Sequence, residues 1–131
     1  MPVRSLRSSV LKWPDRTAVD CAVREWAHAA ARGRPEVVRI GYFGSYARGD
    51  WGVGSDVDLV VLVDRAEEPF ARRAATWDTT RLPVPADLLV YTSEEWEGIR
   101  QRGFGRGIAG GVVWVYPAPN KNNLQPVCFA L

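Results

Sequence analysis

Residues 37–63 read VVRIGYFGSYARGDWGVGSDVDLVVLV and contain two apolar, β-branched runs separated by a glycine-rich stretch. The first run, 37–43, predicts a strand that ends at the turn formed by Gly44 and Ser45. The second run, 57–63, is almost unbroken, which is typical of a central strand covered on both faces. The residues between the two runs predict a turn, a short helix and a loop.

Weaker patterns on either side of this stretch predict the other elements of one domain. Residues 17–32 carry apolar side chains at three- and four-residue steps, which predicts an amphipathic helix. The remaining expected elements are a helix that opens at Pro69 with an apolar stripe of Phe70, Ala74 and Trp77, a strand over 84–91, a helix capped by Thr92 and a strand over 112–116. This order predicts a small α/β (α+β) domain with a mixed sheet of about four strands flanked by helices.

The chain of 131 residues has the length of one compact domain. We expect a flexible N-terminal arm over 1–14, the folded domain over 15–116 and an irregular C-terminal tail over 117–131. Residues 103–111 contain five glycines but lack the Lys-Ser/Thr of a P-loop, so we interpret them as a flexible connector.

Net charge, apolar runs and cysteine content indicate the expected localisation and which partners are not expected. The formal net charge of +2 is too small to indicate nucleic-acid binding, and we expect none. The N-terminus lacks the apolar segment of a secretory signal, and no apolar run is long enough to span a bilayer. Cys21 and Cys128 lie far apart, in no metal-ligand spacing, and predict reduced thiols. We therefore expect a cytoplasmic protein without membrane contact.

The Gly44-Ser45 turn predicts a phosphate-binding element. Backbone amides at the start of a helix, together with a serine hydroxyl, form a natural seat for phosphate oxygens. Gly44 allows the backbone to approach a ligand closely. Arg48 lies one helical turn further on and either adds positive charge to this nucleotide-binding site or pairs with Asp50 on the surface.

Two carboxylates stand at the start of the second strand. Asp56 and Asp58 are two residues apart, so in an extended chain both point to the same face. Neighbouring carboxylates repel each other unless a divalent cation lies between them. A phosphate seat next to such a pair suggests metal-assisted phosphoryl or nucleotidyl transfer.

The stretch from Gly41 to Leu59 resembles the signature of the nucleotidyltransferase superfamily that includes DNA polymerase beta and kanamycin nucleotidyltransferase. In that signature ten residues separate Gly-Ser from Asp-x-Asp, as they separate Ser45 from Asp56 here. The resemblance covers roughly residues 36–116 and implies the polymerase-beta-like fold. Given its small size, the chain is most similar to the minimal nucleotidyltransferases, the MntA-type antitoxins that are paired with HEPN-domain toxins.

The resemblance also implies a third carboxylate on a later strand, and Asp87 in the expected strand 84–91 matches it best. As a residue at the start of a strand, Asp87 has an alternative role as a simple polar side chain. In the family, the catalytic carboxylates Asp56, Asp58 and Asp87 would be ligands of two magnesium ions. Ser45 and the Gly44 backbone would hold the triphosphate of ATP, and Asp87 would be the general base.

For an MntA-type protein the implied reaction transfers AMP from ATP to a tyrosine hydroxyl of the partner HEPN toxin, with release of pyrophosphate. Two alternatives remain open. The chain could be an antitoxin that masks its toxin by contact alone, or a nucleotidyltransferase with a small-molecule acceptor such as an aminoglycoside. The sequence does not indicate the base preference, and both homo- and hetero-oligomers are compatible with it.

Overall fold

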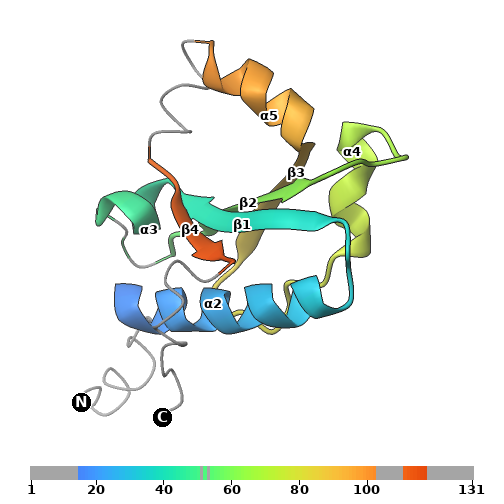
Figure 1. Ribbon diagram of the computed structural model, residues 1–131. Coiled ribbons are helices and arrows are strands. Elements are labelled where there is room, and N and C mark those ends of the chain that lie inside the picture. Colours follow the sequence, from blue (N-terminus) through green and yellow to red (C-terminus); the bar gives the residue numbers. More distant parts are fainter. Residues whose placement is uncertain (1–14, 51, 53, 103–110, 118–131) are drawn as a thin grey trace, which may run out of the picture.

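The computed structural model describes residues 15–50, 52, 54–102 and 111–117, and these form a four-stranded sheet with helices on both faces (Figure 1). The elements in chain order are α2 (Arg16–Arg32), β1 (Val37–Phe43), α3 (Ser45–Arg48), β2 (Val57–Val63), α4 (Phe70–Arg73), the 3-10 helix η1 (Ala74–Thr76), β3 (Ala86–Thr92), α5 (Ser93–Arg100) and β4 (Val113–Tyr116). The expected arm 1–14 and most of the expected tail and glycine-rich connector lie outside the described residues.

The strands lie in the order β3-β2-β1-β4, so the two apolar runs of the motif form the centre of the sheet. β1 pairs antiparallel with both β2 and β4. β2 and β3 are parallel and are joined through α4 and η1. The sheet is therefore mixed and has four strands, as the sequence predicts.

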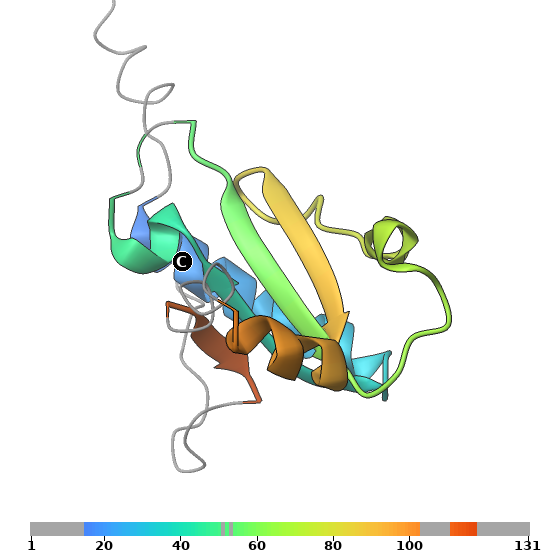
Figure 2. The same ribbon diagram turned by 90° about the horizontal axis from the view of Figure 1, so that it is seen from above.

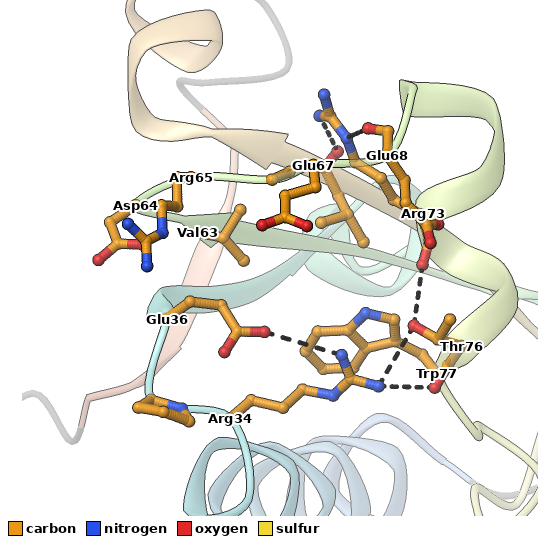
Figure 3. Close-up of a pocket in the computed structure, with 13 residues that line it drawn as sticks. Arg34, Glu36, Val63, Asp64, Arg65, Glu67, Glu68, Arg73, Thr76 and Trp77 are labelled. Carbon is orange, nitrogen blue, oxygen red and sulfur yellow. Dashed lines mark hydrogen bonds and ion pairs between the residues drawn. The ribbon is translucent and has the colours of Figure 1, made fainter.

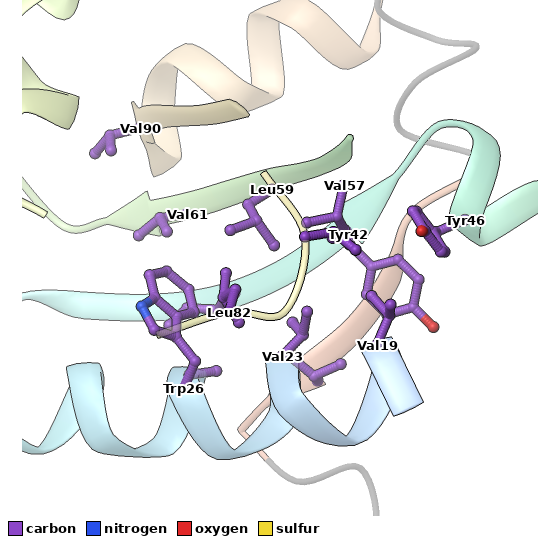
Figure 4. Close-up of a cluster of buried hydrophobic side chains, with 14 of the residues drawn as sticks. Val19, Val23, Trp26, Tyr42, Tyr46, Val57, Leu59, Val61, Leu82 and Val90 are labelled. Atoms are coloured by element: carbon purple, nitrogen blue, oxygen red, sulfur yellow. The ribbon is translucent and has the colours of Figure 1, made fainter. Parts of the chain in front are cut away.

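Helix α2 covers one face of the sheet and supplies the main core (Figure 4). The Asp15 side chain caps its start by accepting a hydrogen bond from the backbone N–H of Ala18 at 2.9 Å. The apolar stripe of α2 then packs against alternate side chains of all four strands. The buried residues of this cluster include Val19, Val23, Trp26, Ile40, Tyr42, Val57, Leu59, Val61, Val90 and Val115.

Helix α5 covers part of the opposite face. Figure 2 shows it lying across the C-terminal end of β2 and leaving the first half of that strand without a helix above it. Its anchor is Trp96, which is 4% exposed and packs on Val60 and Leu62. Thr92 and Glu95 form the expected capping box at its start. α2 thus covers one face of the sheet, and α5 covers the other face toward the C-terminal end of β2.

Three local predictions need correction. The third strand begins at Ala86 and not at residue 84, because Pro85 has no N–H to donate to a strand partner. The helix at Pro69 is only four residues long before it tightens into η1, and Phe70 is 42% exposed instead of facing the core. Cys21 is disulfide-bonded, so the expectation of a reduced thiol is wrong there.

In the part of the chain that the structure describes, no helix has the length and apolar character needed to cross a bilayer.

Candidate active site

Gly44 connects the end of β1 to the start of α3 in a conformation that requires glycine. Its φ of 82° and ψ of −149° lie in a region that side chains with a Cβ essentially never adopt. A Cβ built at this position would collide with the carboxylate of Asp58. The motif glycine therefore brings the backbone of the Gly44-Ser45 turn directly against the first carboxylate of β2, as expected for a phosphate seat next to a charged site.

Strand pairing brings Asp87 next to Asp58. The two residues are direct partners in the parallel register of β2 and β3, so their side chains project from the same face on neighbouring strands. Asp56 precedes β2 by one residue and is exposed, as is Asp87, whereas Asp58 is half-buried. All three residues that the sequence singles out thus lie at the N-terminal ends of β2 and β3.

The proximity of the three carboxylates has an electrostatic consequence. Burial raises the pKa of the Asp58 carboxyl above its ordinary value, and the negative charges of Asp87 and then Asp56 raise it further. The positive charge of Arg48 acts in the opposite direction on the same pKa. Within the described residues, no hydrogen bond or ion pair involves the side chains of the three carboxylates. The cluster is therefore acidic and mutually repulsive, and no cation from the described part of the chain contacts it.

Arg48 makes the surface pair that was one of its two expected roles. Its Nε lies 3.1 Å from Oδ2 of Asp50, and both side chains are more than 60% exposed. Such an exposed pair contributes little to stability, so it does not hold the arginine firmly in place. The expected contact with nucleotide remains a prediction.

A cavity of about 470 Å³ lies at the opposite end of the sheet (Figure 3). Its walls include Val63 and Val90, near the ends of β2 and β3, and the ring of Trp77. The guanidinium of Arg34 stacks on that ring at 4.0 Å and donates to the carbonyl of Thr76 at 2.6 Å. This cavity is separated from the carboxylate edge by the length of the strands, so it is not part of the same site.

Comparison with known proteins agrees with this geometry. A family model described as nucleotidyltransferase domain matches residues 25–108, which include every motif residue discussed above. The chain belongs to the nucleotidyltransferase domain family. Its fold is similar to that of a solved Sulfolobus solfataricus protein described as a candidate nucleotidyltransferase, at 19% identity and a TM-score of 0.52, covering 75% of this chain and 85% of that one. None of the curated proteins matches the chain.

The donor set of this nucleotidyltransferase domain fits a divalent cation bound together with substrate. Among the described residues, no three acidic, histidine or cysteine side chains converge as a ready-made metal site. Mg²⁺, however, is usually held by one or two carboxylates plus waters and substrate phosphates. Asp58 and Asp87 are carboxylates in direct register, and no cation of residues 15–50, 52, 54–102 and 111–117 forms an ion pair with them, so they suit that mode of binding.

Two features of the site were missed in the sequence. Phe43 is the antiparallel partner of Asp58 and thus stands beside it on the same face, which strand alternation and the short β1–β2 connection could have indicated. Tyr42 points to the other face, where its hydroxyl donates to Asp20 of α2 at 2.7 Å. No sequence pattern indicates that second contact, since 22 residues separate the partners.

Proposed function

We propose that this protein is an MntA-type nucleotidyltransferase that moves AMP from ATP to a tyrosine hydroxyl of a partner HEPN toxin and so acts as its antitoxin. The observation that carries the proposal is the register of Asp58 with Asp87, next to Asp56 and against the Gly44-Ser45 turn. It combines a carboxylate cluster with a phosphate seat, as nucleotidyl transfer requires.

Different residues of the site would bind the phosphates, hold Mg²⁺ and accept the proton of the acceptor. The Ser45 hydroxyl and the backbone of Gly44 would hold the β- and γ-phosphates, with Arg48 nearby to add charge. Asp56, Asp58 and Asp87 would hold Mg²⁺, which when bound supplies charge neutralisation on the phosphate oxygens. Asp87 is exposed at the start of its strand, so it can reach an acceptor that approaches from solvent and take its proton.

The reaction then balances as a simple substitution. The acceptor oxygen forms a bond to the α-phosphorus while the bond from that phosphorus to the oxygen bridging to the β-phosphorus breaks. The hydroxyl proton passes to the Asp87 carboxylate, and pyrophosphate leaves toward the Gly44-Ser45 turn. An acceptor on another protein is favoured because Asp56 and Asp87 are exposed, within reach of a macromolecule.

The test uses ATP labelled either at the α- or at the γ-phosphate, with Mg²⁺ and the product of the adjacent gene as the proposed HEPN partner. We expect label from α-labelled ATP, and none from γ-labelled ATP, on the HEPN protein. Asp58→Asn should abolish transfer, whereas Asp64→Asn, at the far end of β2, should not.

The outcomes separate the alternatives. Tight binding of the two proteins without transfer would leave an antitoxin that acts by contact only. Transfer to an added aminoglycoside, and none to the HEPN protein, would show a small-molecule acceptor. Label from the γ-phosphate would mean phosphoryl transfer and would contradict the proposed reaction.

A further inference from the structure

β3 stands at the end of the strand order β3-β2-β1-β4 (Figure 2). One of its backbone edges pairs with β2, and the other has no neighbouring strand in the described part of the sheet. An outer strand presents N–H and C=O groups that can pair with another extended chain. The use of this edge as a docking surface depends on which residues face outward and on whether their backbone groups are free.

Backbone hydrogen bonds establish which residues of β3 face outward. The carbonyl of Pro85 accepts a hydrogen bond from the N–H of Val57 at 2.9 Å, so Pro85, directly before β3, faces β2. Successive residues of a strand direct their backbone groups to opposite edges. Ala86 and Leu88 therefore face outward, one on each side of Asp87 in the chain.

Both ends of the outer edge are already closed. At the C-terminal end, the guanidinium of Arg73 donates to the carbonyl of Val90 at 3.1 Å. The N–H of Thr92 donates to the Glu95 carboxylate at 2.9 Å, so it is occupied as well. At the N-terminal end, Pro85 has no N–H with which to extend the pairing. These contacts confine any added chain to the first part of β3.

The backbone groups of Ala86 and Leu88 are free for such a chain. Their N–H and C=O groups form no hydrogen bond with any residue in the ranges that the structure describes. Both residues are half-buried, whereas Asp87 between them is exposed. We call residues 86–88 the open segment of β3. When a strand is added to a sheet edge, main-chain hydrogen bonds of this kind supply the affinity.

Strand addition at the open segment sets a partner residue beside the carboxylates of the site. A residue directly opposite Asp87 on an added strand has its Cβ about 4.5–5.5 Å from that of Asp87, on the same face. Asp58 is the partner of Asp87 on β2, so the added residue and the two carboxylates form one row across the sheet. The partner's side chain is thereby delivered to the proposed general base.

Neighbouring side chains of β3 indicate the kind of segment that fits. Leu89 lies next to Asp87 in the chain and pairs with Val60, a member of the apolar cluster around Trp96. Leu88 packs against the main core on the α2 face. An extended segment with apolar residues next to its hydroxyl-bearing residue is therefore complementary to this part of β3.

We propose that the protein acceptor binds as an added β-strand along the open segment, and that the residue opposite Asp87 carries the hydroxyl that receives the nucleotide. The inference rests on the proposed function, because it takes the acceptor to be a protein and Asp87 to be the general base. In an in-line displacement the acceptor and the pyrophosphate lie on opposite sides of the α-phosphorus. The β3 side and the Gly44-Ser45 turn stand on opposite sides of Asp58, as this geometry requires.

Amide hydrogen exchange, measured by NMR on the full-length protein with and without the product of the adjacent gene, tests the pairing directly. ATP is left out, so that binding is observed apart from transfer. The N–H of Leu88 should exchange readily in the protein alone and about tenfold or more slowly in the complex. The N–H of Leu89 faces β2 and should be protected in both samples.

A proline variant tests the consequence for transfer. Leu88→Pro removes the outward N–H, and an outer strand tolerates proline where its N–H would face solvent. The residue before a proline must be extended, as Asp87 already is in β3. Leu88→Ala is the matched variant, since it also alters the side chain that packs on the core but keeps the N–H.

At limiting partner concentration we expect Leu88→Pro to transfer label from α-labelled ATP about five- to hundredfold more slowly than Leu88→Ala. Binding of ATP with Mg²⁺, measured by calorimetry, should be equal in the two variants. Equal transfer rates would overturn the inference. If Leu88→Pro does not fold, the exchange of the Leu88 N–H in the wild-type protein decides alone.

The outcomes distinguish this inference from the proposed function. If label reaches the partner while the Leu88 N–H stays unprotected in the complex, the acceptor does not bind along β3, although the proposed function stands. Protection in the protein alone that grows with its concentration would mean that a second copy of this chain occupies the edge, and the inference would fail. Protection by the partner without any transfer of label would overturn the proposed function and, with it, the role of the bound strand as acceptor.

Discussion

Replacing Gly44 by alanine should damage both stability and chemistry, and the structure separates the two effects. The backbone at Gly44 has φ 82° and ψ −149°, a region in which a residue with a Cβ costs about 1–3 kcal/mol. The added methyl group would also overlap the carboxylate of Asp58. That carboxylate must then move, and a displacement of about 1 Å at a reacting centre costs about a hundredfold in rate.

Gly49 provides the matched control. It also has a positive φ, 91° with ψ 6°, but a Cβ there meets nothing within 4 Å. Gly49→Ala should therefore cost about 1–2 kcal/mol of backbone strain and leave the carboxylates in place. Gly33, with φ −96° and open space around it, should tolerate alanine without loss.

The assays are urea unfolding followed by circular dichroism, and the rate of transfer of α-labelled phosphate. We expect both Gly44→Ala and Gly49→Ala to lower the free energy of unfolding, but only Gly44→Ala to reduce the rate by about a hundredfold. Equal rates for the two folded variants would refute the claim that Gly44 is needed to position Asp58. Unchanged stability in Gly44→Ala would refute the strain argument.

Three further changes test other contacts. Asp58 has a raised pKa when folded, so its contribution to stability is complete below the unfolded value of about 3.9 and is lost as pH rises through the folded value. Near neutral pH, Asp58→Asn removes a carboxylate charge that neighbouring carboxylates repel, and should raise the free energy of unfolding by on the order of 0.2–1 kcal/mol. Urea unfolding measured at a series of lower pH values should show this difference between variant and wild type disappear. Arg73→Ala removes the guanidinium that donates a hydrogen bond to the carbonyl of Val90 at 3.1 Å. Thermal unfolding should show that the free energy of unfolding falls by about 1–3 kcal/mol. An unchanged free energy of unfolding would mean that water takes the place of the arginine. Burial and the neighbouring Asp20 raise the pKa of the Tyr42 hydroxyl to about 12. Tyr42→Phe removes this hydroxyl and its hydrogen bond to Asp20, and should lower the free energy of unfolding by about 0.5–1.5 kcal/mol. In an ultraviolet titration the variant should lack the tyrosine with the highest pKa, and an unchanged titration would contradict the assignment to Tyr42.

The sequence determined the elements that carry the motif. The two central strands have the bounds that the apolar runs predict, since β-branched runs of this length have few alternatives. The capping box at Thr92 is equally local, because both of its hydrogen bonds lie within four residues. The apolar pattern predicts a start of the third strand two residues too early, because it includes Val84, which is buried but stands between two prolines.

Which side chains share the site depends on the pairing of the strands. Asp56 and Asp58 are close because two residues of extended chain separate them, and that follows from the sequence alone. Asp87 joins them through the parallel register of β2 and β3, and Phe43 through the antiparallel register of β1 and β2. Register depends on how whole strands pack their faces against α2 and α5, a sum of contacts over the entire sheet that no short stretch of sequence contains.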